Sequence, residues 1–439
     1  MKEKESLNQN IYDNNNIVYV DKFNYDIQTI ENNYIKEHYK IDKIKYDKIE
    51  KILEKIKLYK KNNIIPDNIF WKELRKISTQ PGGFISIKIR REIYSFILDT
   101  LGKKPEFIIT PSNVNEKQVN SYDTIIKNDC KRSVLHSIIR NNDNFQKYQN
   151  NKKINDSVYS NDSNDTQSTQ VTQNESDENQ LIVDTYINEL MSFTKESLGN
   201  YEYFNYFQGY QEICLYFMII FGRKEGVRYM TLFGKIYLDY VLSKNYKINF
   251  DMLLDILNDC CNIVNKKVNS LINKITKTKP YYSLSWLITY LTHSNDNIYN
   301  ELSLLDYFIT SNIGHMYFLS ANIIVSEFNK IGTKFNITAD EEFTYMELFF
   351  QHFQNLKVSV IDYEKIIKDN EKLNHRLFND IISYRITNIT NENDKGTLML
   401  LNRNIYDNEI FDNLSIKTKL LYFLIAVILL FIFYKIFVK

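Results

Sequence analysis

The chain has 439 residues, 44% of them hydrophobic, so it is long enough to bury a substantial core in one large domain or two smaller ones. Its 55 basic and 54 acidic residues leave a formal net charge of only +1, which favours a protein partner and no nucleic acid. The few glycines (11) and prolines (5) favour long helices over a turn-rich β-protein. The four cysteines lack metal-ligand spacing and no signal peptide precedes them, so we expect a cytosolic, reducing environment and no metal site.

The N-terminal residues 1–65 are charged and rich in Asn and Tyr, and we interpret them as a partly helical extension. Within them, apolar residues recur at helical spacing from Tyr46 to Tyr59, which predicts one amphipathic helix. The composition of the sequence changes at Pro66, where we expect the globular domain to begin. The break Pro81-Gly82-Gly83 then precedes an apolar and basic segment, Phe84 to Leu101, that fits a helix.

The predicted domain spans residues 66–378 and contains one low-complexity stretch. Residues 149–180 are almost entirely Asn, Asp, Ser, Thr, Gln and Lys, a composition that cannot bury enough apolar surface to offset its ordering entropy, so we interpret them as a disordered insertion. Helical periodicity then resumes, and no segment shows the two-residue alternation of strands, so we expect an all-α fold. The helices predicted after the insertion are 181–193, 212–221, 227–242, 252–275, 283–291, 302–310 and 315–328.

A polar stretch, 379–418, is interpreted as a linker to residues 419–438, which are predicted to cross a membrane. The 19 positions 420–438 are apolar on every face apart from Lys435. As a helix they span about 28 Å, close to a hydrocarbon core of about 30 Å. A buried core helix is the weaker alternative, since an all-round apolar helix fits lipid better. We therefore expect a tail-anchored protein with its N-terminal domain in the cytosol, on the endoplasmic reticulum or, given the basic flanks, the mitochondrial outer membrane.

Ile126, Asp129 and Arg132 stand at positions i, i+3 and i+6. In a helix they lie on one side, so Ile126 can pack inward while Asp129 braces an exposed Arg132. A braced guanidinium loses less entropy when it enters a nucleotide pocket, and its planar fork suits phosphate oxygens. The alternative is a surface Asp/Arg pair that contributes a few tenths of a kcal/mol. The spacing alone leaves both interpretations open.

A second motif, Tyr206-Phe207-Gln208-Gly209, precedes a strongly apolar run. Gly209 permits unusual backbone angles and a close approach to a partner, while the Gln208 amide can both donate to and accept from a water molecule. The alternative is a simple loop-to-helix turn in which Tyr206 only packs. Phosphoryl transfer needs positive charge on the γ-phosphate oxygens and a group that orients the attacking water. Arginine and glutamine are suited to these two roles.

Together the motifs resemble the paired signatures of TBC domains, Ile-x-x-Asp-x-x-Arg and Tyr-x-Gln-Gly. Pro81-Gly82-Gly83-Phe84 and the following Ile89-Arg90-Arg91 resemble the opening signature of that family, with Tyr94 where the family usually has Trp. Three further segments follow in the family's order: Gly209–Cys214, Leu284–Tyr290 with His293, and Leu304–Phe308. These segments are most similar to the endoplasmic-reticulum-anchored subgroup, whose members also end in a hydrophobic anchor.

The resemblance implies an all-α, multi-helical GTPase-activating (Rab-GAP) domain that acts in trans on a Rab-family small GTPase, a Rab1-like one in vesicle transport from endoplasmic reticulum to Golgi. It implies that Arg132 is an arginine finger and Gln208 a glutamine finger, supported by Asp129, Ile126, Tyr206 and Gly209. The chain would then be an activator rather than an enzyme. It would need no cofactor of its own, because the GTPase carries the Mg-GTP. A catalytically inactive Rab-binding scaffold or a membrane tether is the alternative.

Overall fold

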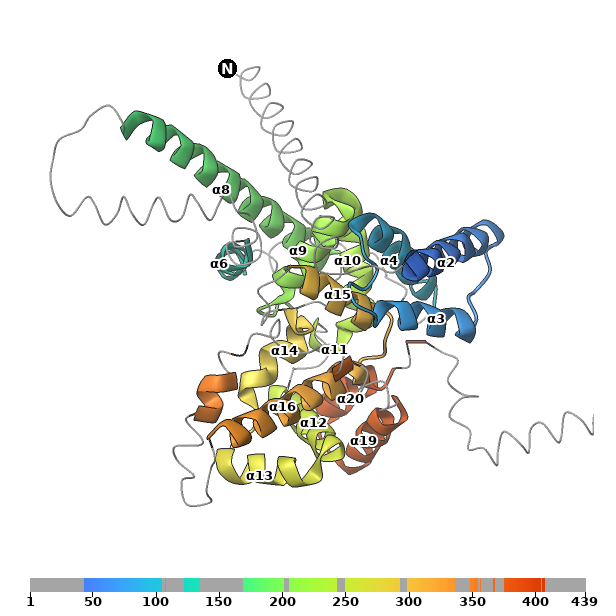
Figure 1. The fold of residues 1–439 in the computed structure, drawn as a ribbon, viewed down its shortest axis with the longest axis vertical. Coiled ribbons are helices and arrows are strands. Elements are labelled where there is room, and N and C mark those ends of the chain that lie inside the picture. Colours follow the sequence, from blue (N-terminus) through green and yellow to red (C-terminus); the bar gives the residue numbers. More distant parts are fainter. Residues whose placement is uncertain are drawn as a thin grey trace, which may run out of the picture.

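The computed structural model describes residues 43–104, 107, 122–134, 169–200, 205–242, 249–292, 298–335, 348–353, 356, 366–367, 375–403 and 405–406. These residues form helices and the turns between them, with no strand among them, which confirms the all-α prediction (Figure 1). The helices are α2 (Lys43–Asn62), α3 (Asn68–Ser78), α4 (Ile87–Leu101), α6 (Asp123–Ser133), α8 (Thr169–Gly199), α9 (Tyr210–Phe221), α10 (Arg223–Tyr237), α11 (Asp239–Leu242), α12 (Phe250–Val264), α13 (Lys266–Thr276), η3 (Tyr281–Ser283), α14 (Leu284–Thr289), α15 (Ile298–Ile309), α16 (Gly314–Phe335), α19 (His375–Asn388) and α20 (Glu392–Leu401).

The helices pack as two groups that are joined through the central helix α9. At one end α2 packs on α3 and α4, and at the other α12 packs on α13, α16 and α19 (Figure 1). Between them α9 contacts α4, α6, α8, α10 and α14. This central position explains its composition, because every residue of α9 except Glu212 is buried. A helix that is apolar all round belongs in the interior of a domain.

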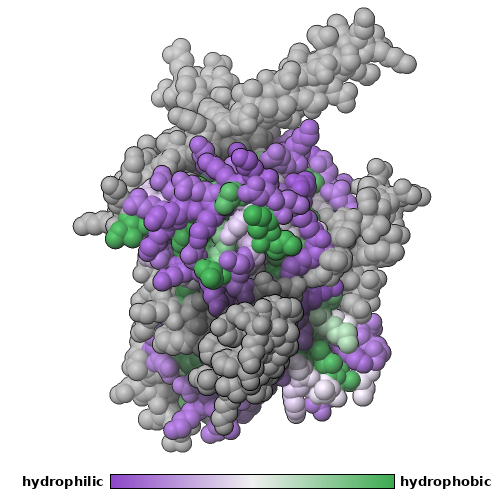
Figure 2. Space-filling model, turned by 90° about the vertical axis from the view of Figure 1, so that its right-hand side faces the viewer, coloured by the Kyte–Doolittle hydropathy of each residue, from purple (hydrophilic) through white to green (hydrophobic). Residues whose placement is uncertain are grey.

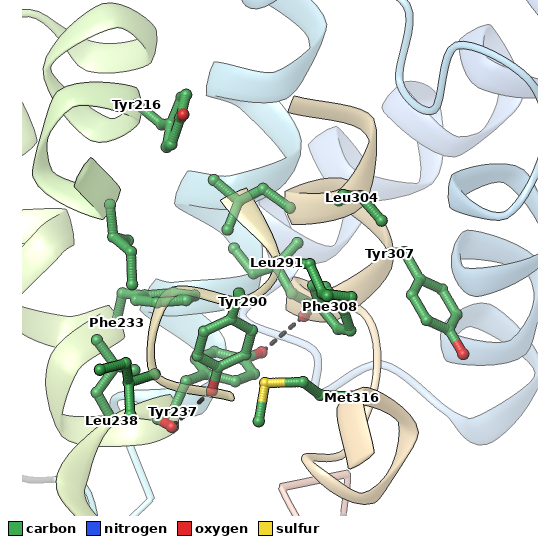
Figure 3. Close-up of a cluster of buried hydrophobic side chains, with 14 of the residues drawn as sticks. Tyr216, Phe233, Tyr237, Leu238, Tyr290, Leu291, Leu304, Tyr307, Phe308 and Met316 are labelled. Atoms are coloured by element: carbon green, nitrogen blue, oxygen red, sulfur yellow. Dashed lines mark hydrogen bonds between the residues drawn. The ribbon is translucent and has the colours of Figure 1, made fainter. Parts of the chain in front are cut away.

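The centre of the core is rich in tyrosine rather than purely aliphatic (Figure 3). The Tyr290 hydroxyl donates to the backbone oxygen of Tyr237 at 2.7 Å, and the Tyr237 hydroxyl donates to that of Ile309 at 2.6 Å. Buried hydroxyl groups require such partners. Burial also raises the pKa of Tyr237 and Tyr290 well above the ordinary value, so both stay neutral donors.

The predicted helix 252–275 is wrong in one respect, since the structure divides it at Asn265. This residue has extended backbone angles, φ −157° and ψ 97°, and its side chain accepts a hydrogen bond from the Val268 N–H at 3.1 Å. Asparagine is a preferred N-cap because its side chain satisfies a free N–H of the first turn. The break therefore ends α12 and begins α13, which turns back along the same end of the molecule.

The predicted N-terminal helix is confirmed as α2, but the boundary of the domain at residue 66 is wrong. Ile49, Ile52 and Ile56 are each at most 2% exposed and belong to the same hydrophobic core as the later helices. Their spacing of three and four residues places them on one face, which packs against α3 and α4. The globular domain therefore includes α2.

The predicted polar linker 379–418 is also wrong over most of its length. It contains the greater part of α19 and all of α20. Ile382, Leu398 and Leu401 are completely buried, and Ile405 is 3% exposed. Short apolar groups in an otherwise polar segment are enough to dock these helices, because they reach a core that other helices already form.

The predicted insertion and anchor are described only in part. Helix α8 begins at Thr169, so the prediction of disorder is wrong for residues 169–180, and 149–168 lie outside the described residues. The predicted anchor, 419–438, also lies outside them. Among the helices that the structure does describe, none combines the length and the apolar character needed to cross a bilayer.

Candidate functional site

Helix α6 presents one buried and one exposed side, as the spacing of its motif predicts. Ile126 is completely buried where α6 packs against α8 and α9. Asp129 is almost as buried, with 2% of its side chain exposed, whereas 64% of the Arg132 side chain is exposed. Arg132 Nη2 forms an ion pair with Asp129 Oδ1. The arginine is therefore held at one guanidinium nitrogen by a carboxylate that water hardly reaches, while most of its side chain stays exposed.

Tyr206 joins this motif to the second one, 77 residues further along the chain. Its hydroxyl donates to Asp129 Oδ2 at 2.6 Å and also lies 2.8 Å from Gln211 Oε1. The Tyr206 ring packs beside Tyr122, with 5.9 Å between the ring centroids. Burial raises the pKa of Tyr206, and the hydrogen bond to Asp129 raises it further, so the hydroxyl keeps its proton. One neutral donor thus connects Asp129 to the turn that carries Gln208.

The turn itself requires glycine at position 209. Gly209 has φ 107°, in the left-handed region, and a Cβ there would lie 2.4 Å from Thr289 Cγ2. Its N–H donates to Gln211 Oε1 at 2.9 Å. Gly209 and its neighbour Phe207 are buried, but Gln208 between them is exposed. The backbone is therefore fixed on both sides of an amide side chain that faces the surface.

Gln211 is the one member of this arrangement that the sequence motifs do not identify. It is 2% exposed, and its Nε2 donates to Ser133 Oγ at 3.2 Å, which ties the turn back to the end of α6. The signal that indicates it is a long polar side chain inside the otherwise apolar run of α9. Buried amides in such surroundings are held by hydrogen bonds, and here three elements share them.

The structure therefore brings the predicted residues together in one place. Asp129, Tyr206 and Gln211 form a buried network, Ile126 holds its helix in the core, and Gly209 shapes its turn. Arg132 and Gln208 are the exposed residues at either edge of this network. Ile125 is also 51% exposed on α6 and offers an apolar contact beside the arginine. We call Arg132, Gln208 and the residues that hold them the finger site.

The segment that resembles the opening signature forms a second, separate cluster. Arg90 and Asp306 are 2% and 0% exposed and form an ion pair at 2.9 Å between Nη2 and Oδ2. Asp306 Oδ2 also accepts from the Phe84 N–H at 2.8 Å. Tyr94 donates to Asp306 Oδ1 at 2.7 Å, so the hydroxyl that distinguishes it from tryptophan has a partner. These contacts link the turn at Pro81-Gly82-Gly83 to α15 and hold the scaffold together.

Neither a metal site nor a reactive thiol is present in the part of the chain that the structure describes. No group of three or more His, Cys, Asp or Glu side chains there could hold a metal ion. Cys130, Cys214, Cys260 and Cys261 are all buried and free. Burial raises the pKa of their thiols, to about 12 in Cys214 and Cys261. A protonated, buried thiol is a poor nucleophile.

A comparison with protein-family models finds no model that matches the chain, and no curated protein matches it closely enough to be identified as a relative. The TBC resemblance thus depends on the quoted motifs, and the finger site supplies the geometry against which to test it.

Proposed function

We propose that this protein is a GTPase-activating protein with a TBC fold that acts in trans on a Rab-family small GTPase. The observation that carries the proposal is that the exposed Arg132 pairs with Asp129, and that Tyr206 and Gln211 link Asp129 to the turn that carries the exposed Gln208. A charged fork and a free amide are the two groups that phosphoryl transfer asks of a partner protein. The network restricts Arg132 and fixes the backbone next to Gln208 before the GTPase binds.

Arg132 acts as the arginine finger. Its guanidinium enters the nucleotide pocket of the GTPase and donates to oxygens on which negative charge develops between the β- and γ-phosphates. The ion pair with Asp129 holds the guanidinium before docking, so less rotamer entropy is lost when it enters the pocket. Such a finger accelerates hydrolysis by about 10³ to 10⁵, or roughly 4 to 7 kcal/mol of transition-state stabilisation.

Gln208 supplies the second finger. Its amide accepts from and donates to the attacking water, and so aligns this water with the γ-phosphate. Glycine at position 209 allows the left-handed turn to pack against Thr289, and this turn presents the exposed Gln208 at the surface. The Mg-GTP belongs to the GTPase, so this chain contributes side chains but no cofactor.

The proposed setting follows from the sequence of the tail and from the resemblance. Residues 419–438 anchor the chain in the endoplasmic reticulum membrane, with the mitochondrial outer membrane as the other candidate, and leave the domain in the cytosol. The proposed substrate is a Rab1-like GTPase of early secretory traffic. A GTPase on the same membrane surface meets the finger site at a higher effective concentration than one in solution.

The test is single-turnover phosphate release from a panel of GTP-loaded Rabs, with the full chain reconstituted in a bilayer. We expect Arg132→Ala to lower stimulation by at least about 10³. Lys330→Ala is a matched control, because Lys330 is 58% exposed and pairs with the buried Glu327 three residues earlier, and it should leave the rate unchanged. If Arg132→Ala stimulates as well as the wild type, the finger assignment is wrong. If a Rab binds the wild type without faster hydrolysis, the chain is a scaffold.

A further inference from the structure

A cleft of about 1000 Å³ opens on the side of the molecule that carries α2 and α3, remote from the motifs of the finger site. It lies between the C-terminal ends of α2 and α4, the middle of α10, and the short segment 405–406. None of the residues that line it belongs to the finger site. The proposed GTPase activation therefore gives this cleft no role.

The floor of the cleft is aromatic and its rim is basic. The Trp71 ring centroid lies 5.1 Å from that of Tyr406 and 6.3 Å from that of Phe96. Four basic residues line the cleft against one acidic residue, namely Lys60, Lys103, Lys104 and Arg228 against Asp99. A hollow with an apolar base and a positive mouth suits a ligand that combines an anionic group with hydrocarbon.

Exposed isoleucines stand beside the cleft. Ile64 and Ile65, which line it, are 48% and 82% exposed, and Ile69 in the first turn of α3 is 65% exposed. Figure 2 shows this side of the molecule, with hydrophobic side chains set among hydrophilic ones. Neighbouring exposed isoleucines within a charged surface are typical of a contact with a protein or a membrane. The basic rim and the aromatic floor are also found where proteins meet lipid head groups.

The position of the last described residues favours the membrane. Tyr406 is held by its ring contact with Trp71 and by a hydrogen bond of 2.9 Å between its hydroxyl and that of Tyr237. The Ile405 N–H donates to Asn312 Oδ1 at 3.0 Å. The last residues that the structure describes, Ile405 and Tyr406, therefore form part of the wall of the cleft. Residues 407–419 reach at most about 45 Å before the apolar run at Leu420 begins.

We propose that this cleft binds the head group of an anionic phospholipid in the membrane that holds the anchor. Lys60 and Lys103 contact the phosphate, and Ile64, Ile65 and Ile69 enter the interfacial layer. The proposal rests on the proposed membrane anchor but does not depend on GTPase activation. It gives the domain a defined membrane-facing side, opposite in Figure 1 to the side on which α6 lies.

The buried native cysteines make a direct test possible, because an introduced cysteine can be labelled alone. The full chain with Ile65→Cys carries an environment-sensitive fluorophore in nanodiscs of phosphatidylcholine, with or without phosphatidylserine. Leu271→Cys on α13 is the control, since Leu271 is also exposed (47%) but lies at the other end of the domain. Quenching by nitroxide-labelled lipids reports which position meets the bilayer.

We expect quenching at position 65 to exceed quenching at position 271, and to increase with phosphatidylserine. Lys60→Gln with Lys103→Gln should lower the ratio of docked to undocked domain by about 25-fold, because each lysine near an anionic surface contributes a factor of about five. Lys266→Gln with Lys267→Gln, two exposed lysines of α13, should change nothing. Equal quenching at both positions, or docking that survives loss of Lys60 and Lys103, would overturn the proposal.

Failure of the anchor and failure of the cleft are distinguishable. If the chain does not enter nanodiscs, the proposed anchor is wrong, and the same labelled chain is then floated with vesicles of the two compositions. Phosphatidylserine-dependent flotation with quenching at position 65 supports the cleft without the anchor. Flotation with neither composition refutes it.

Discussion

Replacing Tyr206 with phenylalanine removes one oxygen atom from the network under the two fingers and keeps the ring that packs beside Tyr122. The lost hydroxyl leaves Asp129 without its 2.6 Å hydrogen bond and Gln211 without its 2.8 Å contact. A hydrogen bond to a charged group contributes about 1.5 to 3 kcal/mol, and we expect the lower value because Tyr206 is only partly buried. If all of this 1.5 kcal/mol stabilises the position of the proposed fingers in the transition state, losing it slows stimulated hydrolysis about tenfold.

The assay is single-turnover GTP hydrolysis on one responsive Rab, together with urea denaturation of the same variants. Tyr281→Phe serves as the control, because the Tyr281 hydroxyl also contacts an aspartate, Asp251, but lies outside the finger site. We expect it to leave the rate unchanged. Asp129→Ala combined with Tyr206→Phe should raise the activation free energy by less than the sum of the two single changes, since both remove the same hydrogen bond.

A rate for Tyr206→Phe equal to the wild type, with the free energy of unfolding lowered, would show that the network holds the fold but not the fingers. An unchanged rate and an unchanged stability would refute the whole reasoning. Either result would leave the roles of Arg132 and Gln208 to be judged on their own substitutions.

Three further outcomes follow from the same geometry. Gly209→Ala should lower both stability and stimulation, because its Cβ meets Thr289 Cγ2 and the left-handed backbone costs about 1 kcal/mol or more; adding Thr289→Ser should recover only the steric part, as thermal denaturation would show. Asp306→Ala should destabilise the fold by about 3 to 5 kcal/mol, since it leaves Arg90 buried without its partner, and a change below about 1 kcal/mol in urea denaturation would contradict this. Because the pKa of Tyr206 is raised in the folded protein, its contribution to stability is complete below about pH 10, and it declines above that pH as the unfolded chain loses its proton. The rate of stimulated GTP hydrolysis, where it depends on this hydroxyl, should therefore not change between about pH 7 and 9.

Much of the fold is predictable because its helices carry strong local patterns. Ile49, Ile52 and Ile56 repeat at helical spacing, and α2 lies where that spacing indicates. The orientation of Arg132 is also predictable, because three residues at i, i+3 and i+6 share one side of any helix. The spacing of nearby residues decides both features, and this spacing can be read directly from the sequence.

The remaining features depend on contacts between segments far apart in the chain. Leu398 and Leu401 belong to a short apolar run at the end of an otherwise polar segment, and contacts with distant helices make α20 a helix of the domain. Gln211 is a polar residue within an apolar run, and its hydrogen-bond partners, Ser133 and Tyr206, come from other segments of the chain. Periodicity cannot indicate such a bridge, because the information is in the tertiary packing.

The burial of Asp129 bears on the choice between a functional and a purely structural interpretation of its motif. As a surface pair with Arg132 it would cost almost nothing and contribute a few tenths of a kcal/mol. The carboxylate is instead 2% exposed, and removing a charge from water costs several kcal/mol that its partners only partly offset. A fold selected for stability alone would place an apolar side chain there. The partners of Asp129 are the exposed Arg132 and Tyr206, and Tyr206 also contacts Gln211 beside the turn of Gln208, so the desolvated charge connects the arginine to that turn. The proposed trans-acting catalytic surface requires such a connection.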